Sequence, residues 1–92
     1  MTMTADTPET ALKDGRVVAI AGPVVDVEFP PDALPEINFA LEMDAELEGN
    51  TITITSEVAQ QIGDSRVRAI CLKPTDGLRR GTIVRNLSLI HI

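Results

Sequence analysis

The sequence predicts an all-β domain, a small closed six-stranded antiparallel barrel with a disordered N-terminal extension. Three observations favour this fold class. From Gly15 onward, short runs rich in Val, Ile and Thr alternate with Gly, Pro, Asn and Asp. The 92 residues are enough for one domain with a modest core. That core must be aliphatic, because Trp and Tyr are absent and Phe occurs only twice.

The chain begins with a segment that lacks strand signals. Residues 1–14 are rich in Thr, Asp, Glu and Ala, contain one proline and show no sustained hydrophobic period. A terminal segment of this composition is typical of disorder. We therefore expect a disordered extension over residues 1–14 and the barrel domain over residues 15–86.

The first two expected strands form a hairpin. Residues 16–20 make the first strand and residues 24–29 the second, and Gly22 with Pro23 reverses the chain between them. Along the second strand, apolar residues alternate with two acidic ones, which is the pattern of a barrel wall with one buried face. Two consecutive prolines then end this strand.

The middle of the chain carries two further expected strands. An irregular loop that contains Pro35 leads to a third strand over residues 39–43. We expect an acidic turn over residues 44–50 and then a fourth strand over residues 51–55, where Thr and Ile alternate strictly. The two isoleucines of this fourth strand should point into the barrel.

The last part of the chain supplies the remaining strands. We expect a reversal over residues 60–64 and a fifth strand over residues 66–72, in which Val, Ala and Cys share the inward face. A turn over residues 75–77 follows. The final strand, over residues 81–85, can close the sheet against an early strand and leave no free edge.

Charge and hydropathy disfavour two classes of partner. The formal net charge is −6 and the pI is about 4.5, so the chain repels nucleic-acid phosphates and anionic membrane surfaces. The apolar runs are far shorter than the roughly 20 residues that cross a bilayer, and the start lacks the features of a secretion signal. We expect no nucleic-acid partner and no direct membrane insertion.

The residues that common enzyme classes require are missing. No string has the form GxxxxGK[ST], whose backbone amides and lysine hold nucleotide phosphates. Cys71 is the only thiol and is expected to pack inertly in a strand, while His91 is the only imidazole, which leaves no triad and no zinc cluster. Asp26 and Glu28 fit an exposed strand face better than a glycosidase pair. We therefore assign no catalytic, cofactor-binding or metal-binding residue to this chain.

Four segments of the sequence form a recognisable pattern: GPVVDVEF at 22–29, EVAQQIGD at 57–64, VRAI at 67–70 and TDGLRRG at 75–81. Together they resemble the N-terminal β-barrel domain of the β subunit of F-type ATP synthase. They occur in the order and spacing of that family, and the similarity covers about residues 15–85. The related α subunit, vacuolar-type subunits and flagellar or secretion ATPases begin with a similar barrel, but the first two segments resemble the β subunit of the bacterial type most.

The resemblance implies an assembly role. In that family the barrel joins the barrels of neighbouring α and β subunits in a collar, or crown, above the catalytic head of a proton-translocating ATP synthase. The head lies at the cytoplasmic face of the bacterial plasma membrane as a peripheral part of the complex. ATP, ADP and magnesium bind in a nucleotide-binding domain that follows the barrel, so none of the family's catalytic residues has a counterpart here. The fragment itself is expected to be non-catalytic.

Other functions stay open at this point. One is the equivalent barrel of a related rotary, flagellar or secretion ATPase subunit. Another is a stand-alone barrel that binds a small ligand, although aliphatic filling of six strands should leave little room inside. An oligonucleotide-binding barrel is disfavoured, because such barrels stack bases on aromatic residues beside a basic groove.

The end of the chain departs from the family pattern. The family usually continues through a Thr-Gly turn toward the nucleotide-binding domain, whereas residues 87–92 are an apolar hexamer without glycine. We expect a non-family tail over residues 87–92, foreign sequence fused to a truncated reading frame. The alternative is that these residues extend the last strand.

Charge is distributed unevenly along the sequence. Residues 26–48 contain eight acidic residues and no basic one, whereas residues 66–85 contain six basic residues and one acidic residue. One interpretation is cross-strand pairing within a single barrel. The other is docking between neighbouring barrels in a ring, with Arg79 and Arg80 as the residues to test.

Overall fold

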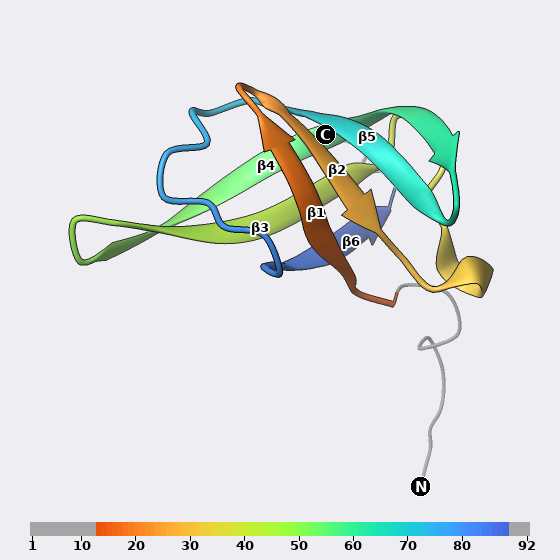
Figure 1. The fold of residues 1–92 in the computed structure, drawn as a ribbon, viewed down its shortest axis with the longest axis horizontal. Helices are drawn as coiled ribbons and strands as arrows, with labels where there is room; N and C mark the ends of the chain where they lie inside the picture. Colours follow the sequence, from red (N-terminus) through yellow and green to blue (C-terminus); the bar gives the residue numbers. More distant parts are fainter. Residues whose placement is uncertain (1–12, 89–92) are drawn as a thin grey trace, which may run out of the picture.

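The computed structural model describes residues 13–88 and confirms the predicted fold class. Six strands form a closed barrel in the order β1-β2-β5-β4-β3-β6, and every neighbouring pair is antiparallel (Figure 1). Residues 1–12 of the expected extension and residues 89–92 of the expected tail lie outside the described part. The elements are β1 (Gly15–Ala21), β2 (Val24–Glu28), the 3-10 helix η3 (Pro31–Ala33), β3 (Ala40–Leu47), β4 (Asn50–Gly63), β5 (Arg66–Cys71) and β6 (Ile83–Ser88).

The first hairpin forms as predicted. Strands β1 and β2 pair across a turn in which Gly22 has a positive φ of 60°, a conformation that a residue without Cβ adopts easily. A register shift between Val17 and Ala19 interrupts the ladder. The final strand also closes the barrel as predicted, because β6 pairs with β1 on one side and with β3 on the other.

The predicted acidic turn over residues 44–50 is wrong. Strand β3 continues through Leu47, β4 begins at Asn50, and only Glu48 and Gly49 form the turn, with positive φ values of 53° and 82°. Two left-handed residues suit the tight turn that matches the twist of an antiparallel hairpin. The acidic residues before the turn are strand residues, and their carboxylates accept hydrogen bonds from threonines on the opposite strand.

Strand β4 is also longer than predicted. It extends to Gly63, so residues 60–63 belong to the strand, and the reversal lies at Asp64 and Ser65, with positive φ values of 57° and 62°. Two register shifts near its end, between Val58 and Gln60 and between Gln61 and Gly63, accompany this extension. Bulges of this kind bend a strand and let it follow the curve of a barrel.

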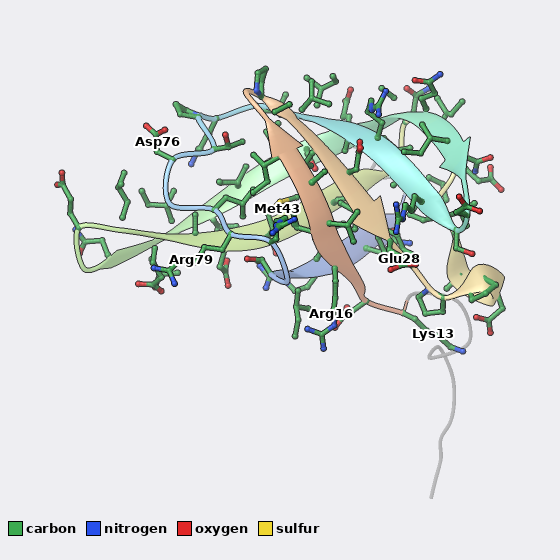
Figure 2. The ribbon with its side chains drawn as sticks, in the orientation of Figure 1. Lys13, Arg16, Glu28, Met43, Asp76 and Arg79 are labelled. Atoms are coloured by element: carbon green, nitrogen blue, oxygen red, sulfur yellow. The ribbon has the colours of Figure 1, made fainter. Side chains whose placement is uncertain are left out.

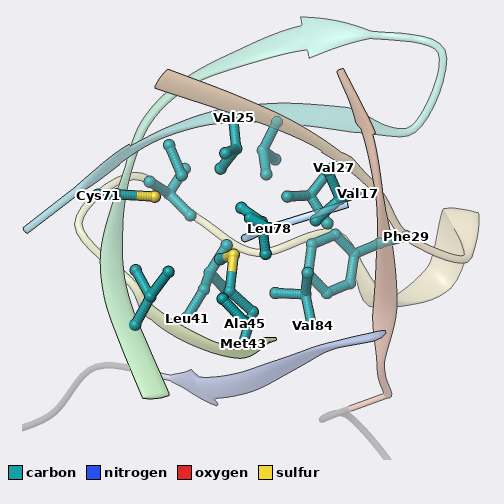
Figure 3. Packing of buried hydrophobic residues seen from close by; sticks show 14 residues of the cluster. Val17, Val25, Val27, Phe29, Leu41, Met43, Ala45, Cys71, Leu78 and Val84 are labelled. Carbon is teal, nitrogen blue, oxygen red and sulfur yellow. The ribbon is translucent and has the colours of Figure 1, made fainter. Parts of the chain in front are cut away.

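The core consists mainly of aliphatic side chains from all six strands, and the aromatic ring of Phe29 joins them (Figure 3). The predicted inward face of β5 is confirmed, since Val67 and Ala69 are fully buried and Cys71 is nearly so. Ile54 also points inward as expected, whereas Ile52 is only partly buried. Burial raises the pKa of the Cys71 thiol, which keeps it protonated and agrees with a packing role.

A loop between β5 and β6 closes one end of the barrel. Its Leu78 side chain joins the core cluster and appears among the strands' side chains in Figure 3. Several hydrogen bonds hold the loop against other elements, and three of them come from different parts of the loop. Thr75 Oγ1 donates to the Gly22 carbonyl (2.7 Å), Glu46 N donates to the Gly77 carbonyl (3.3 Å), and Gly81 N donates to the Val17 carbonyl (2.8 Å).

The buried hydroxyl of Ser56 leads to a prediction about stability. Ser56 is fully buried, and its Oγ has no hydrogen-bond partner among the described residues. An unpaired buried hydroxyl opposes folding, so Ser56→Ala should leave the free energy of unfolding unchanged or raise it by up to about 1 kcal/mol. Urea unfolding of the two proteins measures the difference. A loss above about 1 kcal/mol would show that the hydroxyl is satisfied, for instance by a bound water.

Strand β6 starts two residues later and ends later than predicted. It includes Leu87, which is half-buried, and Ser88, whose backbone lies opposite Ala40 of β3. Residues 87 and 88 therefore extend the last strand, as in the alternative considered above. For the remaining tail residues, 89–92, foreign origin stays a prediction.

Candidate interaction surfaces

The acidic residues of β2 and β3 form ion pairs across the outer wall of the barrel. Arg68 on β5 donates two hydrogen bonds to Asp26 on β2, at 2.9 and 3.2 Å. Arg85 on β6 contacts both Glu42 and Asp44 on β3, at 3.0 and 3.1 Å. These contacts confirm cross-strand pairing within one barrel. They also place Asp26 in a structural ion pair rather than in a catalytic one.

Hydrogen bonding perturbs the Asp44 carboxyl group. The Arg85 guanidinium and the Thr53 hydroxyl both donate to it and hold its pKa below the ordinary value of 3.8. A carboxyl whose pKa is lowered by folding stabilises the folded state when it is ionised. This stabilisation is present above pH 3.8 and is lost as the pH falls through the lower pKa of the folded state.

Removal of the Arg85 guanidinium should therefore weaken the domain in a pH-dependent way. We expect Arg85→Gln to have a lower urea midpoint than the wild type near neutral pH. The difference should shrink as Asp44 becomes protonated in acid. Arg80→Gln is the control, because its guanidinium has no ion pair among residues 13–88. Its urea midpoint should change with pH in parallel with that of the wild type. If the urea midpoint of Arg85→Gln stays below that of the wild type by the same amount down to about pH 2, this account is contradicted.

A second group of arginines has no such partners. Arg79 and Arg80 lie exposed in the turn that leads into β6, where Thr82 donates two hydrogen bonds to the Arg79 carbonyl. Arg16 on β1 lies opposite Ile83 of β6 and donates to the Gly81 carbonyl. Figure 2 shows the side chain of Arg16 pointing outward below β1 and that of Arg79 pointing outward below β3. Within residues 13–88 none of these three side chains has an ion pair.

Apolar side chains are exposed on the outer wall at β2 and β5. Ile70 is 41% exposed and Leu72 is 68% exposed, and Val24 of β2 lies opposite Ile70. Sequence reasoning missed these residues as surface features. The signal was available, because inward-facing Val67, Ala69 and Cys71 place the alternate positions of this segment on the outside.

Ile83 at the start of β6 is another exposed apolar residue, with 46% of its surface accessible. With the fold and its outer surface described, comparison with known families becomes informative. The family model described as ATP synthase alpha/beta family, beta-barrel domain, matches residues 17–88. The chain belongs to the ATP synthase alpha/beta family.

The match spans the barrel of this alpha/beta family from β1 to the end of β6. It confirms the resemblance at the level of the family, which includes both alpha and beta types. Arg79 and Arg80 and the exposed apolar residues of β5 and β6 all lie within it. The candidate surfaces are therefore features of an alpha/beta-family barrel and not of an appended segment.

The described residues of this alpha/beta-family barrel do not fit a nucleotide site. A phosphate loop needs a glycine-rich turn that opens a helix, whereas the helix described here is the three-residue η3, whose first residue is proline. Within residues 13–88, no three Asp, Glu, His or Cys side chains are grouped so that they could hold a metal ion. In the same range, no helix has the length and apolarity to cross a membrane.

Proposed function

We propose that this chain is the N-terminal collar domain of the catalytic β subunit of a bacterial F-type, proton-translocating ATP synthase. In this role the barrel binds neighbouring α and β subunits and helps to assemble the catalytic head, and it performs no chemistry. The observation that carries the proposal is where the fold places the segments that resemble the β subunit.

Three of these segments lie on adjacent strands. Residues 22–29 include the first hairpin turn and β2, residues 67–70 lie in β5, and residues 57–64 form the end of β4 with its turn. In the barrel β5 pairs with β2 on one side and with β4 on the other. Segments that are separated in the sequence thus build one continuous wall. The preference for the β-subunit type over related ATPase barrels rests on the sequence resemblance of residues 22–29 and 57–64.

The filled interior disfavours the alternative of a ligand-binding barrel. Val25, Leu41, Met43, Val67 and Val84 have no exposed surface, and Leu78 closes one end. The hollow beside Val24 and Arg68, about 320 Å³ in volume, is lined by partly or fully exposed residues and not by the core.

The proposal extends to location and cofactors. As part of the synthase head, the chain would lie at the cytoplasmic face of the bacterial plasma membrane without inserting into it. ATP, ADP and magnesium would bind in the domain that follows the barrel in the full-length subunit.

The isolated chain should neither bind nor hydrolyse ATP. Its sequence has no phosphate loop, and the barrel has no cluster of acids, bases or nucleophiles that could act on a phosphate. Calorimetric titration with ATP and magnesium should give no saturable heat. Binding at micromolar affinity would show that the collar role is incomplete.

The assembly role is tested in the full-length subunit that carries this barrel. Its mixture with the partner subunit should sediment as a complete head, and deletion of residues 15–88 should prevent this. A barrel-deleted subunit that still assembles normally would rule out the collar role. Loss of assembly, with the nucleotide-binding domain still folded and binding ATP, would support it.

A further inference from the structure

The hairpin of β3 and β4 extends beyond the part of the sheet that closes the barrel (Figure 1). Strand β5 pairs with β4 from Ser56 onward, and β6 pairs with β3 up to Met43. The rest of the hairpin, residues 44–47 of β3 and 50–55 of β4, pairs only with itself among the described strands. We call this part the hairpin tip. Each of its two strands has one edge that no described strand covers.

The loop between β5 and β6 crosses the tip from one edge to the other. Leu72 N donates to the Thr55 carbonyl at the β4 edge (2.9 Å), and farther along the loop the Gly77 carbonyl accepts from Glu46 N at the β3 edge (3.3 Å). The loop thus covers part of the β3 edge. Between Thr55 and the turn of the hairpin, the β4 edge has no backbone partner from the loop within residues 13–88.

This open β4 edge exposes the backbone groups of Thr51 and Thr53. Residues two apart in a strand point their backbone groups the same way, so these N–H and C=O groups point out from β4 as the Thr55 carbonyl does. Among residues 13–88 their one partner is Lys73, whose Nζ lies 3.5 Å from the Thr53 carbonyl. An exposed edge of this kind is a template for another strand, and a lysine beside it is a usual protection.

The sequence of the open edge is complementary to itself. Residues 51–55 read Thr-Ile-Thr-Ile-Thr in both directions and carry no charge. Thr51 and Thr53 are exposed on one side of the strand, whereas Ile52 lies on the other side and borders, with Leu47, a hollow of about 220 Å³. An added strand must present polar and apolar residues in the same alternation. A second copy of this strand, running antiparallel, does so at every position.

We propose that the open β4 edge binds the same edge of a second copy of this chain, with Ile52 of one copy opposite Ile52 of the other. In this register Thr51 of each copy lies opposite Thr53 of the other, so the exposed N–H and C=O groups bond reciprocally. The contact uses one surface twice, as a two-fold dimer requires. The two hairpins then form one four-stranded sheet. This inference goes beyond the collar role and does not depend on it.

The same register brings opposite charges together. It places Gly49 of each copy opposite Thr55 of the other, so the neighbouring Glu48 reaches the end of the edge where Lys73 lies. Glu48 and Lys73 are both exposed, and neither has an ion pair among residues 13–88. Each copy therefore supplies a carboxylate to the lysine that must move aside from the Thr53 carbonyl. This complementarity favours a second copy over an unrelated extended peptide.

Sedimentation velocity of the 92-residue chain tests the proposal. The wild type should shift from monomer to dimer as its concentration rises. Thr53→Pro removes one outward N–H, and proline is tolerated where the N–H of an edge strand faces solvent. This variant should raise the dissociation constant of the dimer about tenfold or more. Thr51→Pro replaces it if thermal unfolding shows that the first variant is not folded. A wild type that stays monomeric up to about 1 mM overturns the proposal.

Amide exchange locates the contact in the wild type. Exchange at the Thr51 and Thr53 amides should slow as the protein concentration rises, because these two N–H groups are bonded only in the dimer. The amide of Ile52 points toward β3, so its exchange should depend much less on concentration. Dimer formation without slower exchange at Thr51 and Thr53 overturns the proposal.

Exchange of two charges tests the register. Lys73→Glu and Glu48→Lys should each raise the dissociation constant, because each places like charges together between the copies. The double variant restores two opposite pairs and should dimerise with nearly the affinity of the wild type. A double variant as weak as the sum of its two single variants overturns the register.

Matched controls lie away from the open edge. Ile37→Ser and Ile70→Ser remove isoleucines that are 54% and 41% exposed elsewhere on the surface. Deletion of residues 89–92 removes the apolar end of the chain. All three variants should dimerise like the wild type. Loss of the dimer in any of them, or an unchanged affinity in a folded Thr53→Pro variant, overturns the proposal. The collar role is tested separately, by deletion of the barrel from the full-length subunit.

Discussion

Substitution of Gly77 by alanine is expected to lower the midpoint of thermal unfolding by about 15 °C. Two effects add. Gly77 has a positive φ of 84°, a backbone conformation that costs a residue with Cβ about 1 kcal/mol. An added Cβ would also overlap the backbone carbonyl of Glu46, which belongs to a paired strand and cannot move away freely. Relief of that overlap would break the hydrogen bond from Glu46 N to the Gly77 carbonyl, for a total of about 3 kcal/mol.

Gly49→Ala provides a closely matched control. Gly49 has nearly the same φ, 82°, but no atom lies within 4 Å of the position that its Cβ would take. This variant should lose only the conformational part, about 1 kcal/mol or roughly 5 °C. The difference between the two variants measures the contact between the loop and β3. Equal losses would mean that the loop does not press against β3 in solution.

Leu78→Ala is expected to destabilise the domain by about 2–3 kcal/mol. Leu78 is 9% exposed and belongs to the core cluster although it comes from a loop. Its truncation removes apolar contacts and opens a cavity at the end of the barrel, where the neighbouring strands are fixed by their ladders and cannot collapse into the space. Urea unfolding measures the loss.

Leu72→Ala is the control for this truncation. It deletes the same atoms from the same connecting segment, but Leu72 is 68% exposed, so the loss should stay within about 0.5 kcal/mol. A loss for Leu78→Ala as small as that for Leu72→Ala would show that the loop does not close the barrel.

Local patterns explain how much of the fold could be predicted. The alternation of Val67, Ala69 and Cys71 with polar or exposed residues depends only on the two-residue period of a strand, and the structure confirms their burial. The turn at Gly22 needs a residue that tolerates positive φ, which is also a local property.

Local patterns also explain the errors. A turn was predicted at Asp44 and Glu46 because acidic residues are rare in strands. In the structure each lies opposite a threonine that donates a hydrogen bond to its carboxylate, and Arg85 from a third strand binds Asp44. That environment exists only after distant segments have met. The extension of β4 beyond residue 55 escaped prediction for a related reason, since its bulged end is paired with β5.

The sequence by itself determined which residue types are available to the candidate surfaces and how they are spaced along the chain. It established an aliphatic core, a barrel without a phosphate loop, an uneven distribution of charge and the family pattern, because each of these depends on residue type and short-range spacing. Only the tertiary structure decided which arginines are neutralised. Arg68 and Arg85 lie beside carboxylates across strand ladders, whereas Arg79 and Arg80 lie in a turn and have no ion pair among residues 13–88.

The tertiary structure likewise decided that β5 and β6 are on opposite walls and that Leu78 closes the barrel. Both facts follow from the order of the strands around the barrel. That order places β5 between β2 and β4 through pairings of residues far apart in the sequence. Such pairings depend on the free energy of the whole closed sheet, and no window of neighbouring residues contains that information.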